Sequence, residues 1–201
     1  NITFLPASAH IPITGFDTGP GNCLMDAWIA QHLNHTFDKN GRFAASGQVY
    51  PMLLHTCMRD PYFTKAPPKS TGREYFNDKW LEKNIAIVNA SISPRDVQAT
   101  LVALTAYSIG DAILRHAPTN STIFVCGGGA RNTYLIETLV NYLHRPVSST
   151  ESLGVPPDWV EAMLFAWLAK QTLEGKAGNC PSVTGARNST ILGGVFGYRP
   201  T

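Results

Sequence analysis

Apolar residues alternate with small or polar residues in two short stretches near the start of the chain, residues 1–6 and residues 11–16. A period of two is typical of β-strands, because successive side chains point to opposite faces of the strand. Residues 7–10 between the two stretches are enough for the chain to reverse its direction. The pattern therefore predicts an antiparallel hairpin over residues 1–16.

Apolar residues at helical spacing mark four later segments, residues 23–30, 94–117, 134–143 and 160–174. Repeats at three and four positions place these side chains on one face of a helix. The second segment has the clearest start, because Ser93 can cap its first turn and a proline follows directly. We expect this segment to be a scaffold helix.

A glycine-bracketed loop joins the second expected strand to the first expected helix. Gly19 and Gly21 lack Cβ atoms, so backbone N–H groups can approach an anion there, and Asn22 can cap the helix. The positive end of that helix favours a phosphate. Asp17 lies beside the loop, where a carboxylate repels phosphate unless it holds a metal ion or takes a proton. We interpret the loop as a phosphate site with catalytic chemistry; the alternative is a tight turn in which Asp17 caps the helix.

The same order of strand, glycine loop and helix recurs further along the chain. Residues 122–126 form an apolar run typical of a buried strand, and Gly127, Gly128 and Gly129 follow it directly. Three glycines leave room for a phosphate or a flat ring against the backbone, and Asn132 can cap the next helix. Tight packing of backbone segments demands the same residues, so this pattern alone is a weak signal.

A polar cluster lies between the two glycine loops. Segment 55–68, with three prolines and two neighbouring aromatic residues, is interpreted as an ordered loop that leads into residues 69–76. This cluster contains Lys69, Ser70 and Arg73. Lysine and arginine bind anions, and hydroxyl groups complete the hydrogen bonds to phosphates or sugars. We interpret the three residues as a site for a ligand with carboxylate, phosphate or sugar hydroxyl groups; the alternative is a solvated junction between loop and helix.

One carboxylate lies on the apolar face of the last expected helix. On a helical wheel of residues 160–174, Glu161 falls inside an arc of apolar side chains. Burial of an isolated charge costs several kcal/mol or more, so such a residue is seldom left unpaired. The pattern favours a Glu161 that faces a cleft over one that is paired structurally in the core.

The composition indicates a globular protein. The 201 residues are 44% hydrophobic, which suffices for one large domain or two small lobes. A net charge of +2 from well-mixed residues gives no sign of a nucleic-acid or membrane partner. We find no apolar run near the roughly 18 residues that cross a bilayer, and no signal-peptide pattern, and therefore expect a cytoplasmic protein. Scattered cysteines favour buried free thiols over zinc or disulfides.

Five motifs, taken together in order and spacing, resemble the anhydro-N-acetylmuramic acid kinase family. The motifs are residues 15–22, 69–76, 126–132, 158–162 and 181–186. The resemblance extends along the whole chain. It implies an α/β fold, with a mixed sheet flanked by helices in a ribonuclease-H-like lobe of the actin-like ATPase and sugar-kinase superfamily. It also implies conversion of 1,6-anhydro-N-acetylmuramic acid, ATP and water to N-acetylmuramic acid 6-phosphate, a step in the recycling of bacterial cell wall.

The resemblance implies roles for the candidate residues. Asp17 is similar to the family's catalytic base, which would deprotonate the water that attacks the anomeric carbon. Glu161 is similar to the second acid of the sugar pocket. The expected contacts to the sugar also include Lys69, Ser70 and Arg73. The expected contacts to ATP are Gly19, Gly21, Asn22, Gly127, Gly128, Gly129 and Asn132. Magnesium should arrive with ATP, but the metal ligands stay unknown, and Asp26 is a weak candidate.

The family also has a glycine- and serine-rich phosphate loop in an N-terminal lobe, and residues 1–201 contain nothing like it. We therefore expect this sequence to be the C-terminal lobe of a two-lobe kinase and to be inactive alone. Two alternatives stay open: a nucleotide-binding regulatory module without catalysis and, ranked below it, a hydrolase with metal ligands. The expected partners are ATP and an anhydro-amino-sugar, without nucleic acid or membrane, and a homodimer is left open.

Overall fold

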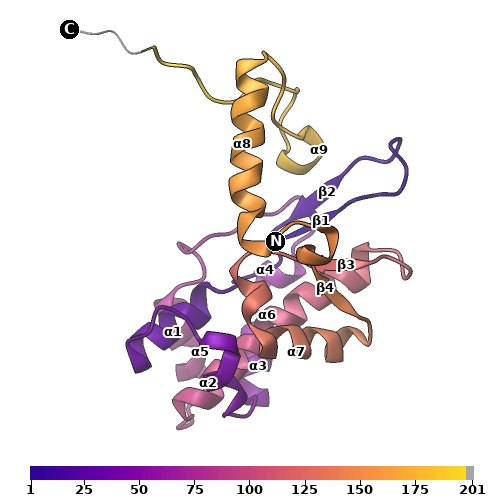
Figure 1. Ribbon diagram of the computed structural model, residues 1–201. Helices are drawn as coiled ribbons and strands as arrows, with labels where there is room; N and C mark the ends of the chain where they lie inside the picture. The colour runs from indigo at the N-terminus through magenta and orange to yellow at the C-terminus, as the bar shows by residue number, and fades with distance from the viewer. Residues whose placement is uncertain (198–201) are drawn as a thin grey trace, which may run out of the picture.

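The computed structural model describes residues 1–197 as a mixed α/β structure with small sheets and many helices (Figure 1). Its strands form two separate sheets: β1 pairs antiparallel with β2, and β3 pairs parallel with β4. The predicted hairpin is confirmed, but the single mixed sheet is wrong for these residues, because each strand is short and helices lie between the pairs. The strand bounds are β1 Ile2–Phe4, β2 Thr14–Phe16, β3 Ile123–Val125 and β4 Val147–Ser149.

Helix α6 (Pro94–His116) is the centre of the core and confirms the predicted scaffold helix. Its N-cap is Ser93, whose hydroxyl accepts a hydrogen bond from the Asp96 N–H at 3.3 Å. It packs against four other helices. These helices are α1 (Cys23–Leu33), α2 (Arg42–Ala45), α3 (Pro51–Met58) and α7 (Thr133–Leu143). Large apolar side chains of three of them, α1, α3 and α7, are fully buried around it, and α2 contributes the buried Ala44.

Helix α6 corrects one expectation from the sequence. By length and composition it could cross a membrane, although the sequence was expected to hold no such segment. However, 78% of its most apolar stretch is buried inside the fold. Burial on nearly all sides is typical of the core helix of a globular domain.

The segment predicted as an ordered loop, residues 55–68, is partly helical. Helix α3 continues into it, and α4 (Pro61–Thr64) follows. The carboxylate of Asp60 starts α4 by accepting a hydrogen bond from the Tyr62 N–H at 2.8 Å, and proline occupies the first turn. Next along the chain comes α5 (Asp78–Val88). Aromatic side chains join α4 to the start of α5 around Phe76, which is 1% exposed.

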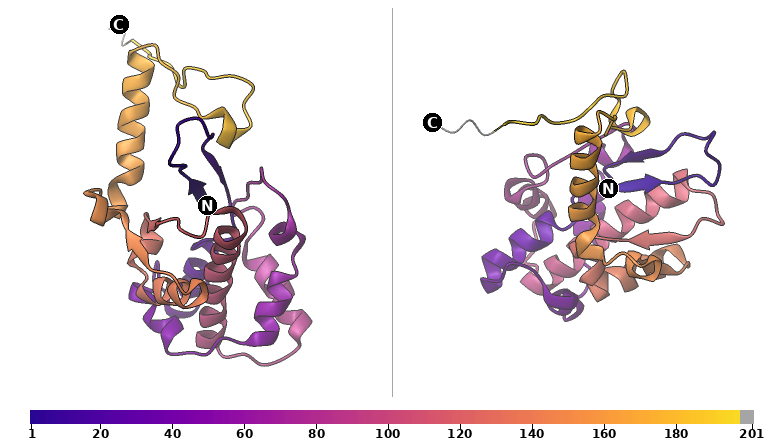
Figure 2. Two further views of the ribbon diagram at one scale, coloured as in Figure 1. Left: turned by 90° about the vertical axis from the view of Figure 1, so that its right-hand side faces the viewer. Right: turned by 45° about the horizontal axis from the view of Figure 1, so that its top comes forward.

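Helix α8 (Val160–Leu173) stands away from this helical body (Figure 1, Figure 2). The predicted helix is confirmed, but its apolar arc is not buried: Phe165 is 69% exposed and Leu173 is 74% exposed. Helix α9 (Pro181–Thr184) returns to the hairpin, where the Ser182 hydroxyl donates a hydrogen bond to the Ile13 carbonyl at 2.6 Å. The short 3-10 helices are η1 (Lys39–Gly41), η2 (Gly128–Arg131), η3 (Thr150–Leu153) and η4 (Pro157–Trp159).

Candidate active site

Asp17 lies directly after β2, and three hydrogen bonds tie it to α4 and to the segment that follows α4. Its N–H donates to the Lys69 carbonyl at 3.1 Å, and its carbonyl accepts from the Tyr62 hydroxyl at 2.8 Å. The Thr71 N–H donates to carboxylate oxygen Oδ2 at 2.9 Å. No residue among 1–197 donates to the other oxygen, Oδ1. One oxygen is therefore fixed while the other is free to accept a proton.

The side chain of Asp17 borders an open hollow of about 560 Å³. Lys69 and Ser70 line the same hollow, so the structure brings these predicted site residues together. Helix α9 closes the far side with Val183 and Thr184. The hollow can hold a ligand of sugar size beside a carboxylate, an ammonium group and a hydroxyl.

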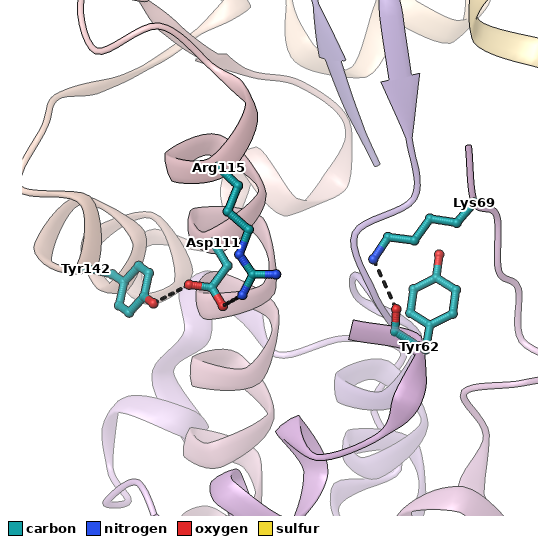
Figure 3. A network of polar contacts seen from close by, with 5 residues as sticks. All are labelled: Tyr62, Lys69, Asp111, Arg115 and Tyr142. Atoms are coloured by element: carbon teal, nitrogen blue, oxygen red, sulfur yellow. Dashed lines mark hydrogen bonds and ion pairs between the residues drawn. The ribbon is translucent and has the colours of Figure 1, made fainter. Parts of the chain in front are cut away.

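Lys69 has a structural contact in addition to its place at the hollow. Its ammonium group donates a hydrogen bond to the Tyr62 carbonyl at 3.1 Å and lies 4.8 Å from the centre of the Tyr62 ring (Figure 3). Burial lowers the pKa of Lys69, and the charges of Arg115 and Lys65 lower it further. The contacts with Tyr62 fix the position of the ammonium group.

Figure 3 also shows the polar contacts that join the C-terminal part of α6 to α7. Asp111 accepts a hydrogen bond from the Tyr142 hydroxyl of α7 at 2.6 Å and pairs with Arg115 at 3.3 Å. Burial, followed by the bond to Asp111, raises the pKa of Tyr142 to about 12. The hydroxyl of Tyr142 therefore stays protonated at neutral pH and joins α7 to α6.

Arg73 does not line the hollow with Lys69 and Ser70. Arg73 is exposed. Burial raises the pKa of Asp26 on α1, and the charge of Arg73 offsets part of this rise. Arg73 lies within a turn over residues 72–76, since the N–H groups of Tyr75 and Phe76 both donate to the Gly72 carbonyl. The three residues predicted as one cluster are therefore not all at the hollow, because Arg73 is held in this turn. Their close spacing in the sequence does not reveal the turn.

The first glycine loop combines packing with an open backbone. A Cβ atom at Gly19 would lie 2.9 Å from the Phe63 ring and 3.0 Å from the Ser108 hydroxyl, so close packing alone explains this glycine. Gly21 has a φ of +56° and nothing within 4 Å of a Cβ position, and its carbonyl accepts a hydrogen bond from Thr105 at 2.8 Å. Gly21 is the position of this loop where a ligand could approach the backbone.

Asn22 does not cap α1 through its side chain, so that prediction is wrong. Its backbone is already helical, with a φ of −84°, whereas a capping residue needs an extended backbone to direct its side chain at the first turn. The side chain instead lies beside the second glycine loop: Cβ atoms at Gly128 and Gly129 would come within 3.7 and 3.4 Å of it. Asn22 therefore brings the two glycine loops together.

The second glycine loop leads into α7 as predicted. The side chain of Asn132 accepts a hydrogen bond from the Leu135 N–H at 3.0 Å, which confirms it as the cap of α7. Gly127 has a φ of +74° and open space around its Cβ position. The space beside the Gly127 Cα is thus open, while the Asn132 oxygen is committed to the helix.

Glu161 lies on the exposed first turn of α8 and does not line the hollow beside Asp17, so its expected place at a cleft stays a prediction. The wheel argument assumed a covered helix face, and the described residues leave that face open. The start of α8 is nevertheless joined to the second glycine loop. The Gly127 N–H donates to the Pro157 carbonyl at 3.0 Å, and Arg131 pairs with Asp158, whose pKa it lowers. Glu161 thus follows closely on the segment that contacts this loop.

Comparison with known proteins decides the relationship. The family model described as "Anhydro-N-acetylmuramic acid kinase" matches residues 1–198. The chain belongs to the anhydro-N-acetylmuramic acid kinase family. The resemblance inferred from the five motifs is therefore confirmed.

Curated relatives in this family are similar along nearly the whole chain. An anhydro-N-acetylmuramic acid kinase of Coxiella burnetii (strain Dugway 5J108-111) is 50% identical over 98% of the chain and 52% of the relative. One of Xylella fastidiosa is 47% identical over 97% of the chain and 50% of the relative, and one of Saccharophagus degradans is 47% identical over 98% and 52%. The chain spans about half the length of these curated relatives.

Asp26, the candidate metal ligand, does not belong to a cluster of metal-binding side chains in the described residues. Within residues 1–197, no three histidine, cysteine, aspartate or glutamate side chains are grouped closely enough to hold a metal ion. Asp26 is therefore not part of a group of three such side chains in the described part of the chain. We assign no magnesium ligand.

Several residues around Asp17 gave no signal in the sequence. Tyr62 acts through its hydroxyl and Thr71 through its backbone N–H, and both contacts depend on how the segment between α4 and α5 folds back onto the hairpin. Val183 and Thr184 lie in one of the family motifs, but only the structure places them at the hollow. Every residue except proline has a backbone N–H, so the contact from Thr71 could not be recognised from residue type.

Proposed function

We propose that the protein containing this chain is an ATP-dependent kinase that opens 1,6-anhydro-N-acetylmuramic acid with water and phosphorylates O6. The observation that supports this most is Asp17, which presents one fixed and one free carboxylate oxygen at a hollow of sugar size. Membership in the family and relatives bearing this name favour the same reaction. The product would be N-acetylmuramic acid 6-phosphate, in the recycling of bacterial cell wall.

The proposed step needs one base. The free oxygen of Asp17 accepts a proton from water as the water oxygen bonds to the anomeric carbon C1. The bond from C1 to O6 breaks, and O6 takes the γ-phosphoryl group of ATP. ADP is the leaving group of this transfer. Water, sugar and ATP thus become sugar phosphate and ADP, with the released proton passing through Asp17 to solvent. Phosphoryl transfer itself depends on positioning and charge stabilisation.

We assign the nucleotide to the two glycine loops. Gly21 and Gly127 leave open space where a side chain would otherwise lie, which suits phosphate or a flat base against the backbone. Gly19, Asn22, Gly128, Gly129 and Asn132 complete the proposed set. Magnesium bound with ATP would neutralise charge on the phosphates. The close approach of Asn22 to Gly129 supports one continuous nucleotide site.

On the sugar side we propose Lys69 and Ser70, which share the hollow with Asp17, together with Arg73 and Glu161. We also propose that residues 1–201 form the C-terminal, ribonuclease-H-like lobe of a two-lobe kinase. A nucleotide-binding regulatory module is the second candidate, favoured by the open glycine loops alone. It would bind ATP without turnover.

The test is ADP release by the complete protein with and without the anhydro-sugar. The kinase is expected to release ADP only when the sugar is present and to form equal amounts of ADP and sugar phosphate. Nucleotide binding without any product would instead support the regulatory module. ADP release that does not depend on the sugar would contradict the proposed reaction.

Substitution of Glu161 separates a role at the sugar from a structural role. Because Glu161 is exposed, Glu161→Gln is expected to leave the melting temperature unchanged while it lowers turnover of the anhydro-sugar in the complete enzyme. Thermal melting and product formation measure the two effects, with Glu137→Gln on α7 as the control for loss of one carboxylate. A drop in melting temperature, or unchanged turnover, would argue against Glu161 as a sugar contact.

A further inference from the structure

We infer that Tyr62 is a positioning residue for the proposed base Asp17: its hydroxyl fixes the Asp17 backbone and its main chain anchors the segment that holds the carboxylate. This inference rests on the proposed function, in which Asp17 accepts a proton from water. Tyr62 forms no hydrogen bond to either carboxylate oxygen of Asp17. It acts through the backbone and through neighbouring residues.

The hydroxyl of Tyr62 is a constant hydrogen-bond donor. Tyr62 is 4% exposed, and its hydroxyl donates to the Asp17 carbonyl at 2.8 Å. Burial, together with the smaller effect of the Asp17 charge, raises the pKa of Tyr62 to about 12. The hydroxyl is therefore protonated throughout the neutral range and keeps this contact.

The ring of Tyr62 is held in place by its surroundings. It packs edge-to-face against Phe76 with ring centres 5.4 Å apart, and it also contacts Phe63 and Tyr75. Asp60 fixes the same cluster by accepting hydrogen bonds from the Tyr62 N–H at 2.8 Å, the Tyr75 hydroxyl at 2.7 Å and the Trp80 indole N–H at 2.8 Å. The Tyr62 hydroxyl is thus presented to Asp17 by a packed and hydrogen-bonded support.

The main chain of Tyr62 holds the other side of Asp17. Its carbonyl accepts a hydrogen bond from the Lys69 ammonium group at 3.1 Å, and the Lys69 carbonyl accepts one from the Asp17 N–H at 3.1 Å. Two residues further along, the Thr71 N–H donates to the Asp17 carboxylate at 2.9 Å. A closed ring of contacts therefore runs from Tyr62 to Asp17 and back through Lys69. Loss of one contact would loosen the carboxylate.

The test compares Tyr62→Phe with Tyr75→Phe in the complete enzyme. Both variants remove one tyrosine hydroxyl from the same aromatic cluster, but only the Tyr62 hydroxyl contacts Asp17. Tyr62→Phe is expected to lower kcat roughly 10- to 100-fold with an unchanged KM for ATP, since a small misplacement of a reacting group has effects of this size. Tyr75→Phe should keep kcat. Equal kcat values for the two variants would overturn the inference.

A second comparison distinguishes positioning from general loosening. In an Asp17→Asn background, Tyr62→Phe should cause no further loss of kcat, because the group that it positions is already gone. Independent, additive losses would overturn the inference. Failure of the proposed function would look different, since the unaltered enzyme would then form no sugar phosphate.

Hydrogen exchange tests the inference without any substrate. Tyr62→Phe is expected to increase the exchange rates of the Asp17 and Thr71 amides, and Tyr75→Phe should leave both rates unchanged. Protection of both amides that is unchanged in Tyr62→Phe would overturn the positioning role, whatever reaction the enzyme catalyses.

Discussion

Replacement of Asp17 by asparagine is expected to lower formation of N-acetylmuramic acid 6-phosphate by the complete enzyme about 10²- to 10⁴-fold, the usual loss for a general base. Asparagine has the size of aspartate and can still accept the Thr71 N–H through its amide oxygen. It cannot accept a proton from water at neutral pH. Ring opening and phosphorylation should fall together, because both follow from the same attack by water.

Nucleotide titration beside product formation measures this effect. Asp17→Asn should bind ATP nearly normally, because the hollow at Asp17 is lined by neither Gly21 nor Gly127, the two positions with open space in the glycine loops. Asp78→Asn on the exposed first turn of α5 is the matched control and should behave as the unaltered enzyme. Near-normal turnover of Asp17→Asn would remove it from the role of base. Lost ATP affinity would instead make it a magnesium or phosphate-loop residue.

Replacement of Asp60 by alanine is expected to lower the free energy of unfolding by about 2–4 kcal/mol, because three donors lose their common acceptor. The donors are the Tyr62 N–H, the Tyr75 hydroxyl and the Trp80 indole N–H. Tyr75 is exposed and can turn to water, so most of the effect comes from the other two. For a chain of this length the melting temperature should fall by roughly 5–10 °C.

Asp60→Asn is the graded control for this prediction. The amide oxygen of asparagine can still cap α4, while its NH₂ group would face the Trp80 indole N–H and lose that bond. Thermal and denaturant unfolding should therefore place Asp60→Asn between the unaltered protein and Asp60→Ala. Equal stability of all three proteins would contradict the role of Asp60 as a central acceptor.

Local signals in the sequence predicted four of the helices, α1, α6, α7 and α8. Ser93 followed by Pro94, and Asn132 before α7, are start signals that act within a few residues, and both caps are observed. The hairpin of β1 and β2 depends on alternation over a short range and is also confirmed. Such features are fixed by neighbouring residues, so the sequence carries them directly.

Features that depend on distant contacts were not predictable in the same way. The strands form two small sheets because long helical segments separate the pairs. Asn22 has a helical backbone and contacts a loop about a hundred residues away, so it does not cap α1. Arg73 lies within a turn over residues 72–76 and does not line the hollow with Lys69, and the apolar arc of α8 is exposed although its periodicity predicts a covered face.

The candidate site shows the same division. Asp17 and the glycine loops were recognisable from residue type and order, and the hollow with Lys69 and Ser70 is in keeping with that interpretation. Tyr62 and Thr71 reach Asp17 across 45 and 54 positions of the chain. Contacts of that range require the fold itself, which joins α4 and the following segment to the end of β2.

The most direct test of the proposed reaction is product analysis after turnover in water that carries a heavy oxygen isotope. The complete enzyme, supplied with ATP and 1,6-anhydro-N-acetylmuramic acid, is expected to form N-acetylmuramic acid 6-phosphate with one heavy oxygen at C1 and none in the phosphate. Mass spectrometry and fragmentation locate the label. A heavy oxygen in the phosphate, or an opened sugar without phosphate, would contradict attack by water at C1 coupled to phosphorylation of O6.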